Sequence, residues 1–167
     1  LLDNLLKWTK SQLGKLTVIP QKLDISGLAD GVVEVMNSVA EVKHIKLIRT
    51  DHESFFVYVD IEMIKSVLRN LISNAVKFSN PDSEIKVGIK AEDGKVIVSV
   101  TDSGKGIKKE DQHKLLKDST HFTTYGTNSE EGSGLGLLLC RDFARKNGGE
   151  LWFESEENLG SVFLYRN

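Results

Sequence analysis

The chain has 167 residues and an ordinary globular composition, with 40% apolar residues, 28% charged residues and a formal net charge of −2. This length favours one domain with a sizeable core, and the near-zero charge gives no support to nucleic-acid binding, which usually shows a basic excess. No apolar run approaches the roughly 18 residues of a membrane span, and a single cysteine, Cys140, excludes an internal disulfide.

The first residues carry apolar side chains at the spacing of a coiled-coil seam. Five positions fall at steps of four, three, four and three: Leu2, Leu6, Thr9, Leu13 and Leu16. These steps are the a/d spacing of a coiled coil. Gly14 weakens the expected helix, and Pro20 ends the segment. Two heptads are too short for a helix that is stable alone, so the pattern fits either a coiled-coil seam or a helix packed on its own domain.

Residues 26–60 predict one helix followed by two short strands. Ser26 is expected to cap the helix N-terminus. The expected apolar face of this helix carries Leu28, Val32, Val35 or Met36, and Val39. His44–Arg49 and Phe55–Asp60 are expected to be strands on either side of the polar turn Thr50–Ser54.

The stretch Ile61–Ser79 predicts the helix on which the catalytic hypothesis depends. Its apolar stripe at helical period consists of Ile64, Leu68, Leu71 and Ala75. Asn70, Asn74 and Lys77 lie on a different edge, at positions i, i+4 and i+7. An amide oxygen suits a hard cation such as Mg²⁺, and an ammonium group suits a phosphate. Alone, the same pattern also fits a core helix with a polar, solvated edge.

Residues 85–106 predict a β-hairpin that ends in an acidic, glycine-rich turn. Alternating residues from Ile85 form one strand, Glu92–Lys95 forms the turn, and Val96–Thr101 forms the return strand. Asp102 stands where that strand stops and opens the sequence Asp-Ser-Gly-Lys-Gly. A carboxylate there can accept a hydrogen bond from the exocyclic amine of adenine, and glycines allow close backbone approach. The plainer interpretation is a turn aspartate followed by glycine.

The remaining sequence predicts a long polar segment, a helix and a last hairpin. Residues 107–131 are charged and weakly periodic, and a polar stretch of this length inside a domain is usually functional or mobile. Gly132-Ser-Gly-Leu-Gly136 precedes a helix over Leu137–Asn147, whose first N–H groups favour a polyphosphate. Glu150–Ser155 and Ser161–Tyr165 predict the hairpin. Helices on one face of a mostly antiparallel sheet give an α+β two-layer sandwich.

Four motifs occur along the chain in a fixed order. They are the helix with Asn70, Asn74 and Lys77, then Asp102–Gly106, Gly132–Gly136, and Gly160-Ser-Val-Phe163. In this order they resemble the N, G1, G2 and G3 boxes of the sensor histidine kinase ATP-binding domain, a member of the GHKL superfamily. The resemblance covers roughly Leu23–Tyr165 and implies the Bergerat ATP-binding fold.

This resemblance implies a domain organisation and an activity. Residues 23–167 would form the catalytic domain. Residues 1–22 would be the end of a dimerisation and phosphoacceptor hairpin, with Thr17–Lys22 as the linker. The cofactors would be ATP and Mg²⁺, and the enzyme would be a protein-histidine kinase. It would transfer the γ-phosphoryl group to a histidine outside the chain.

The resemblance also implies roles for individual residues. Asn74 is expected to bind Mg²⁺ with Asn70 close to the same site, and Lys77 is expected to neutralise phosphate charge; these are the expected catalytic residues. Asp102 is expected to bind the adenine amine, supported by Ser161 through water. The other expected nucleotide contacts are Phe78, Gly104, Gly106, Ile107, Phe122, Gly132, Gly134, Leu135, Gly136 and Leu137.

Two departures from the family pattern bear on mechanism. Asn70 stands where ATP-hydrolysing relatives carry a glutamate that activates water, which favours transfer to an external nucleophile. No arginine follows Phe122 in the expected lid, residues 107–132. Its candidate replacements are Lys114, Lys117, Thr124 and Tyr125. None of the four histidines lies in a phosphoacceptor motif.

The implied partners are the chain's own dimerisation hairpin, the receiver domain of a response regulator and, in the full-length parent, a second copy. Nucleic acid is not among them. The implied location is the cytoplasm, within a membrane-anchored parent. The competing hypotheses are a conformational ATPase of the gyrase B type, an anti-sigma-type serine kinase, and a degenerate nucleotide-binding module used for docking.

Overall fold

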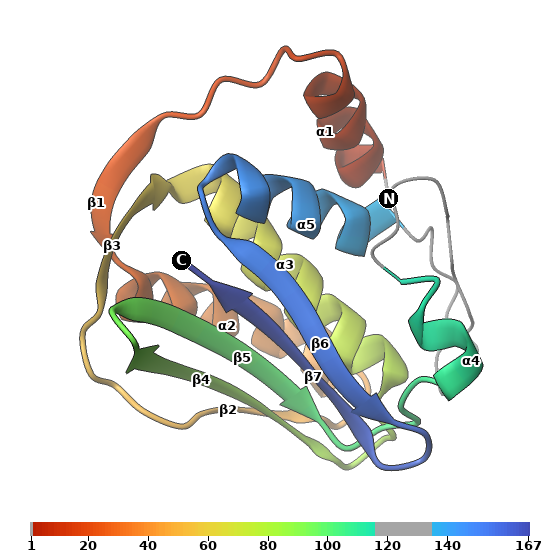
Figure 1. The fold of residues 1–167 in the computed structure, drawn as a ribbon. Helices are drawn as coiled ribbons and strands as arrows, with labels where there is room; N and C mark the ends of the chain where they lie inside the picture. The colour runs from red at the N-terminus through yellow and green to blue at the C-terminus, as the bar shows by residue number, and fades with distance from the viewer. Residues whose placement is uncertain (1, 116–134) are drawn as a thin grey trace.

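A five-stranded sheet and three helices packed on one of its faces form the two layers of the molecule (Figure 1). The computed structural model describes residues 2–115 and 135–167. The described helices are α1 (Leu2–Gln12), α2 (Ile25–Glu41), α3 (Ile61–Phe78), α4 (Lys109–Gln112) and α5 (Leu135–Lys146). The described strands are β1 (Pro20–Asp24), β2 (Lys46–Arg49), β3 (Phe56–Asp60), β4 (Glu84–Glu92), β5 (Lys95–Asp102), β6 (Glu150–Glu156) and β7 (Gly160–Arg166).

The sheet is mixed and mostly antiparallel, as predicted. Its strand order is β2-β4-β5-β7-β6, and only the β2–β4 pair among these is parallel. The predicted β4–β5 hairpin turns through Asp93 and Gly94, which both have positive φ angles (52° and 74°). Positive φ at both turn residues suits a two-residue hairpin loop. The α+β two-layer architecture is therefore confirmed.

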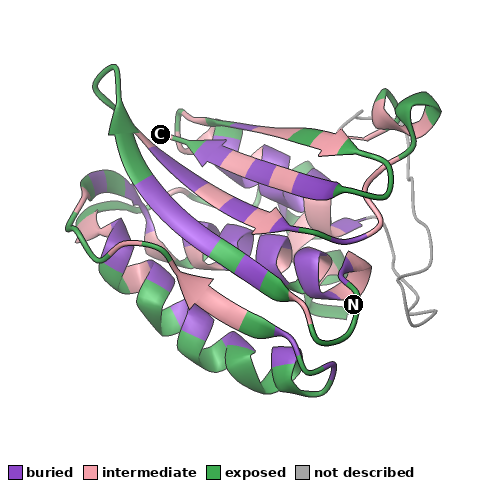
Figure 2. Cartoon of the chain, turned by 90° about the horizontal axis from the view of Figure 1, so that it is seen from below, coloured by how far each residue is buried: buried purple, intermediate pink, exposed green. Residues whose placement is uncertain are grey.

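The core lies between the sheet and α2, α3 and α5. Alternate strand residues point toward the helices, so buried and exposed bands follow one another along the strands (Figure 2). Ile85 and Val87 of β4 are buried, whereas Lys86 between them is exposed. On the helix side, the predicted stripe of α3 is completely buried at Ile64, Leu68 and Leu71. This burial fixes which edge of α3 carries its polar residues.

The start of α2 differs from the prediction. Asp24, in an extended conformation, is the N-cap, and its carboxylate accepts a hydrogen bond from the backbone N–H of Ser26 (3.0 Å). Ser26 instead lies in the first turn, where its hydroxyl accepts from Arg49 (2.8 Å). The predicted cap at Ser26 is thus wrong, because the aspartate two residues earlier satisfies the same helix end. Val35 and Val39 are also exposed, and Met36 takes the buried position.

The two predicted strands at residues 44–60 exist but do not pair with each other. β2 lies at the edge of the large sheet beside β4, whereas β3 pairs with β1 in a separate two-stranded sheet. Residues 20–22, assigned to the expected linker, therefore belong to a strand.

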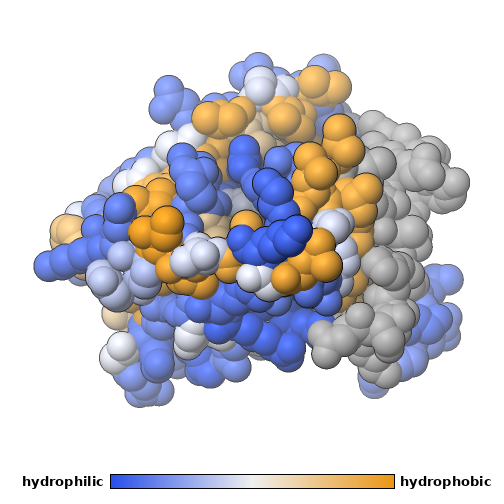
Figure 3. All heavy atoms as spheres, turned by 90° about the horizontal axis from the view of Figure 1, so that it is seen from above, coloured by the Kyte–Doolittle hydropathy of each residue, from blue (hydrophilic) through white to orange (hydrophobic). Residues whose placement is uncertain are grey.

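Helix α1 packs on α5 and keeps its leucine seam exposed. Ser11 bonds Asp142 of α5, and Trp8 packs against the core. Leu2 and Leu6 are more than half exposed, and apolar groups gather on the side of the molecule that carries α1 (Figure 3). The helix ends at Gln12 and is followed by Gly14, whose φ is 67°. Lys15 N donates to Lys10 O (2.9 Å), which is the pattern of a Schellman cap. Within the described ranges, no helix combines the length and apolar character that a membrane crossing requires.

Candidate nucleotide-binding site

Helix α3 presents the predicted polar edge toward the start of α5. The N-cap of this helix is Asp60, whose carboxylate accepts from Met63 N (3.1 Å) and so fixes where the helix starts. Because the apolar stripe of α3 is buried, Asn70 and Asn74 on the adjoining edge of the helix are half-buried. A Cβ atom placed on Gly136 of α5 would lie 3.0 Å from Asn70 Oδ1. The fold thus brings the first and third sequence motifs together.

The two asparagines of this edge have different surroundings. Asn70 Nδ2 donates to Ser66 O (2.8 Å), and Asn70 Oδ1 accepts from Asn4 Nδ2 of α1 (3.0 Å). The side chain of Asn74 has no hydrogen bond to the described part of the chain. The amide oxygen of Asn74 is therefore available to a ligand, whereas that of Asn70 is occupied by α1.

The second motif lies against the C-terminal end of α3. A Cβ atom on Gly104 would lie 2.0 Å from the carbonyl oxygen of Phe78, so only glycine fits there. The same carbonyl accepts a hydrogen bond from Lys105 N (3.1 Å). Phe78 and the Asp102–Gly106 turn are therefore held in direct backbone contact.

Asp102 is a buried carboxylate at the end of β5. Only 7% of the residue is exposed, and its Oδ1 accepts from Gly104 N (2.9 Å). Burial raises the pKa of this carboxyl above its ordinary value of 3.8, against backbone hydrogen bonds from Gly104 and Ser161 that lower it. Ser161 of β7 is its register partner. Such a desolvated acceptor suits a ligand that brings a donor to it.

Ser155 of β6 was not among the predicted site residues, but it links Ser161 of β7 to the chain just after the Asp102–Gly106 turn. Ser155 Oγ lies 2.7 Å from Ser161 Oγ and accepts from Ile107 N (2.9 Å). Gln112 Nε2 of α4 donates to both Ile107 O and Ser155 O, each at 3.0 Å. The β6–β7 register places Ser155 opposite Ser161, and register is not visible in the sequence of either strand alone.

Lys43 is a second residue near the site that was not among the predicted site residues. Its side chain is buried, and its Nζ donates to the carbonyl oxygens of Val76 (3.0 Å) and Lys77 (2.9 Å) at the end of α3. A cation at a helix C-terminus stabilises the last carbonyl groups. Lys43 thereby holds the turn of helix that presents Lys77 and Phe78.

Several predicted residues cannot be placed. Phe122, Gly132 and Gly134, and the lid candidates Lys117, Thr124 and Tyr125, lie outside the described residues. Leu135 and Leu137 lie in the first turn of α5, which begins two residues before the predicted start at Leu137. Lys114 lies just after α4 and pairs with Asp111 (3.2 Å).

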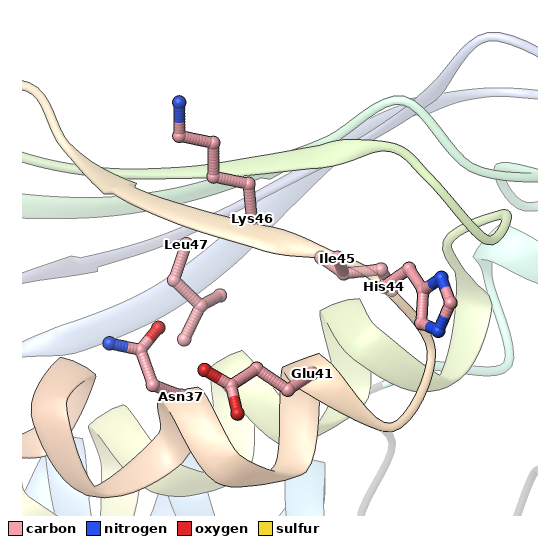
Figure 4. Close-up of a pocket in the computed structure, with 6 residues that line it drawn as sticks. All are labelled: Asn37, Glu41, His44, Ile45, Lys46 and Leu47. Carbon is pink, nitrogen blue, oxygen red and sulfur yellow. The ribbon is translucent and has the colours of Figure 1, made fainter.

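A shallow hollow elsewhere on the surface does not belong to this site. Its volume is about 390 Å³, and it lies between the end of α2 and the edge strand β2 (Figure 4). Leu47 points toward α2, whereas Lys46 points away from it. The other lining residues are Asn37, Glu41, His44 and Ile45. None of the predicted nucleotide contacts lines it.

Comparison with known proteins identifies the family. The model of the histidine kinase-, DNA gyrase B- and HSP90-like ATPases (HATPase_c) matches residues 59–166. The chain belongs to this family. The HATPase_c match covers the helix with Asn70 and Asn74, the Asp102 turn and the β6–β7 hairpin.

Relatives of this HATPase_c chain are sensory kinases. The adaptive-response sensory kinase SasA of Crocosphaera subtropica is 35% identical over 99% of the chain, which spans 43% of that protein. The solved catalytic domain of histidine kinase ThkA is 31% identical, with a TM-score of 0.74 over 89% of this chain and 95% of that one. Full-length ShkA in complex with AMPPNP shares the fold, with a TM-score of 0.79 at 23% identity over 98% of this chain and 34% of that one. The predicted histidine kinase ATP-binding fold is thus confirmed.

Proposed function

We propose that this HATPase_c chain is the Mg-ATP-binding catalytic domain of a sensor histidine kinase. It would transfer the γ-phosphoryl group of ATP to a histidine of a dimerisation hairpin. The observation that carries the proposal is Asp102, a buried carboxylate beside two close backbone approaches at Gly104 and Gly106. That arrangement suits an adenine amine, which needs an acceptor at the floor of its pocket.

The remaining chemistry would come from α3 and α5. Lys77 supplies positive charge for the phosphates, and the N–H groups at the start of α5 add donors and the positive end of the helix dipole. Catalysis would then consist of positioning and charge stabilisation, as in phosphoryl transfer generally. Asn70, an amide in place of a basic carboxylate, supports transfer to an external nucleophile over hydrolysis.

Mg²⁺ would be held by one protein ligand, the amide oxygen of Asn74. Within residues 2–115 and 135–167, no group of three or more acidic, histidine or cysteine residues could hold a metal by itself. Mg²⁺ commonly takes one or two protein ligands together with substrate phosphates and water. The residues present therefore fit a metal that arrives with the nucleotide, where it would neutralise phosphate charge.

Asn74→Ala is expected to remove most of the Mg²⁺ dependence of ATP binding. Calorimetric titration with a non-hydrolysable ATP analogue, with and without Mg²⁺, measures this dependence directly. The wild-type chain should bind more tightly with the metal, and the variant should bind about equally in both conditions. Ser73→Ala, at the exposed neighbouring position of α3, is the matched control. An Asn74→Ala variant that keeps the full Mg²⁺ effect would exclude Asn74 as the ligand, and a wild-type chain without nucleotide binding would overturn the proposed function.

We also expect the chain alone not to phosphorylate itself. His44 and His52 have side chains 78% and 75% exposed, but neither lies in a phosphoacceptor motif. Incubation with γ-labelled ATP should leave the chain unlabelled, while a longer protein that includes the whole hairpin should take up label. Label on one of the chain's own four histidines would refute the external acceptor. Steady release of phosphate would instead favour the conformational ATPase.

The proposed partners follow from the same assignment. Exposed Leu2 and Leu6 on α1, and Leu13 just after it, support the proposal that this helix continues a hairpin that pairs with a second copy in the full-length parent. A receiver domain would accept the phosphoryl group from the hairpin histidine. Both partners, and the cytoplasmic location that ATP and a receiver require, are proposed for the parent protein.

A further inference from the structure

Two ammonium groups converge on the ring of Phe78. Lys77 Nζ lies 4.7 Å from the ring centroid, and Lys105 Nζ lies 5.1 Å from the same centroid. Both distances are within the range of a cation–π contact. Lys77 comes from the end of α3 and Lys105 from the turn after β5, so the fold brings together two positive charges that the sequence separates.

The position of Lys105 is tightly determined by its backbone. Its N–H donates to Phe78 O (3.1 Å), and its carbonyl oxygen accepts from Asn158 N of the β6–β7 turn (2.7 Å). Glycines flank it on both sides, and each approaches another backbone so closely that a Cβ atom would lie 2.0 Å from a carbonyl oxygen. Lys105 is therefore the one position in the 104–106 stretch that can project a side chain.

A polyanion bound beside the Phe78 ring would be attracted to both ammonium groups. We propose that Lys105 is a second phosphate-contacting residue of the nucleotide site, acting with Lys77. It would supply the positive charge that the absence of an arginine after Phe122 removes from the lid. This inference rests on the proposed function and names a residue that the four motifs do not assign.

A structural role for Lys105 makes a different prediction. In a structural role, its aliphatic stem would pack against Phe78 whether or not the ammonium group meets a ligand. Lys105→Met keeps an unbranched apolar stem and removes the charge, whereas Lys105→Arg keeps the charge. Lys86→Met removes a charge from an exposed position on β4, on the sheet face away from the helices, and serves as the control.

The test is titration of these variants and the wild-type chain with ATP, ADP and adenosine, alongside a thermal melt of each. We expect Lys105→Met to bind ATP about tenfold more weakly, the effect of losing one charge-assisted contact. Lys105→Met should also bind ADP more weakly than the wild-type chain does, and its adenosine binding should not change. Lys105→Arg should restore ATP affinity, and Lys86→Met should match the wild-type chain.

Two results would overturn the inference while leaving the proposed function intact. One is unchanged ATP affinity in Lys105→Met, with or without a lower melting temperature, which would indicate packing alone. The other is an equal loss of ATP and adenosine affinity, which would indicate a distorted pocket. A wild-type chain that binds none of the three ligands would instead overturn the proposed function, and this inference with it.

Discussion

Asp102→Asn is expected to weaken ATP binding by roughly ten- to hundredfold, the effect of losing a hydrogen bond to a charged acceptor. The substitution preserves size, and its amide oxygen can still accept from Gly104 N, which lies 2.9 Å from Oδ1 in the wild-type chain. The other atom becomes a donor, however, and a donor facing the adenine amine is mismatched. The measurement is calorimetric titration with a non-hydrolysable ATP analogue.

The same substitution should raise the melting temperature of the ligand-free chain at neutral pH. Burial raises the pKa of Asp102, so the folded state holds its proton more tightly than the unfolded state does. The stability that Asp102 contributes is therefore greatest below its ordinary pKa of 3.8 and is lost as pH rises through the raised folded value. Asparagine has no such titration and removes the penalty of a buried charge at neutral pH.

The control for both effects is Asp93→Asn, which changes an exposed aspartate in the β4–β5 turn. It should alter neither ATP affinity nor the pH dependence of stability. Undiminished ATP binding by Asp102→Asn would exclude Asp102 as the adenine acceptor. A lower melting temperature at neutral pH would show that the strengthening of the hydrogen bonds from Gly104 and Ser161 by the carboxylate charge outweighs the effect of burial.

Gly106→Ala is expected to destabilise the folded chain by about 3 kcal/mol or more, from left-handed backbone strain and steric overlap together. Gly106 has a φ angle of 64°, and a Cβ atom there would lie 2.0 Å from the carbonyl oxygen of Glu156. That oxygen belongs to the backbone of β6, so relief requires the turn after Asp102 to move away from the β6–β7 hairpin. Urea unfolding followed by circular dichroism measures the free-energy change.

Gly94→Ala separates the two causes. Gly94 has a similar φ of 74°, but no atom lies within 4 Å of a Cβ placed there. Only the strain of the left-handed conformation then remains, about 1–2 kcal/mol. Equal losses of stability in the two variants would show that the close approach to Glu156 is unimportant. A larger loss in Gly106→Ala would assign the difference to that contact.

Features that depend on residues near one another in the chain were predicted correctly. Helix α3 follows from a stripe at helical period, and its burial at Leu68 and Leu71 confirms that period. The β4–β5 hairpin follows from alternation and an Asp-Gly turn. Errors occurred at boundaries, where neighbouring residues compete for one role, as Asp24 and Ser26 do at the start of α2.

The sequence by itself determined the family, the architecture and the order of the nucleotide motifs, because each motif is a short run whose chemistry lies in its own residues. Only the tertiary structure decided which side chains meet. Ser155 bonds Ser161 through strand register, Lys43 caps α3 from the turn after α2, and Lys105 reaches Phe78. The partners in these contacts depend on packing and strand register, which no local pattern specifies.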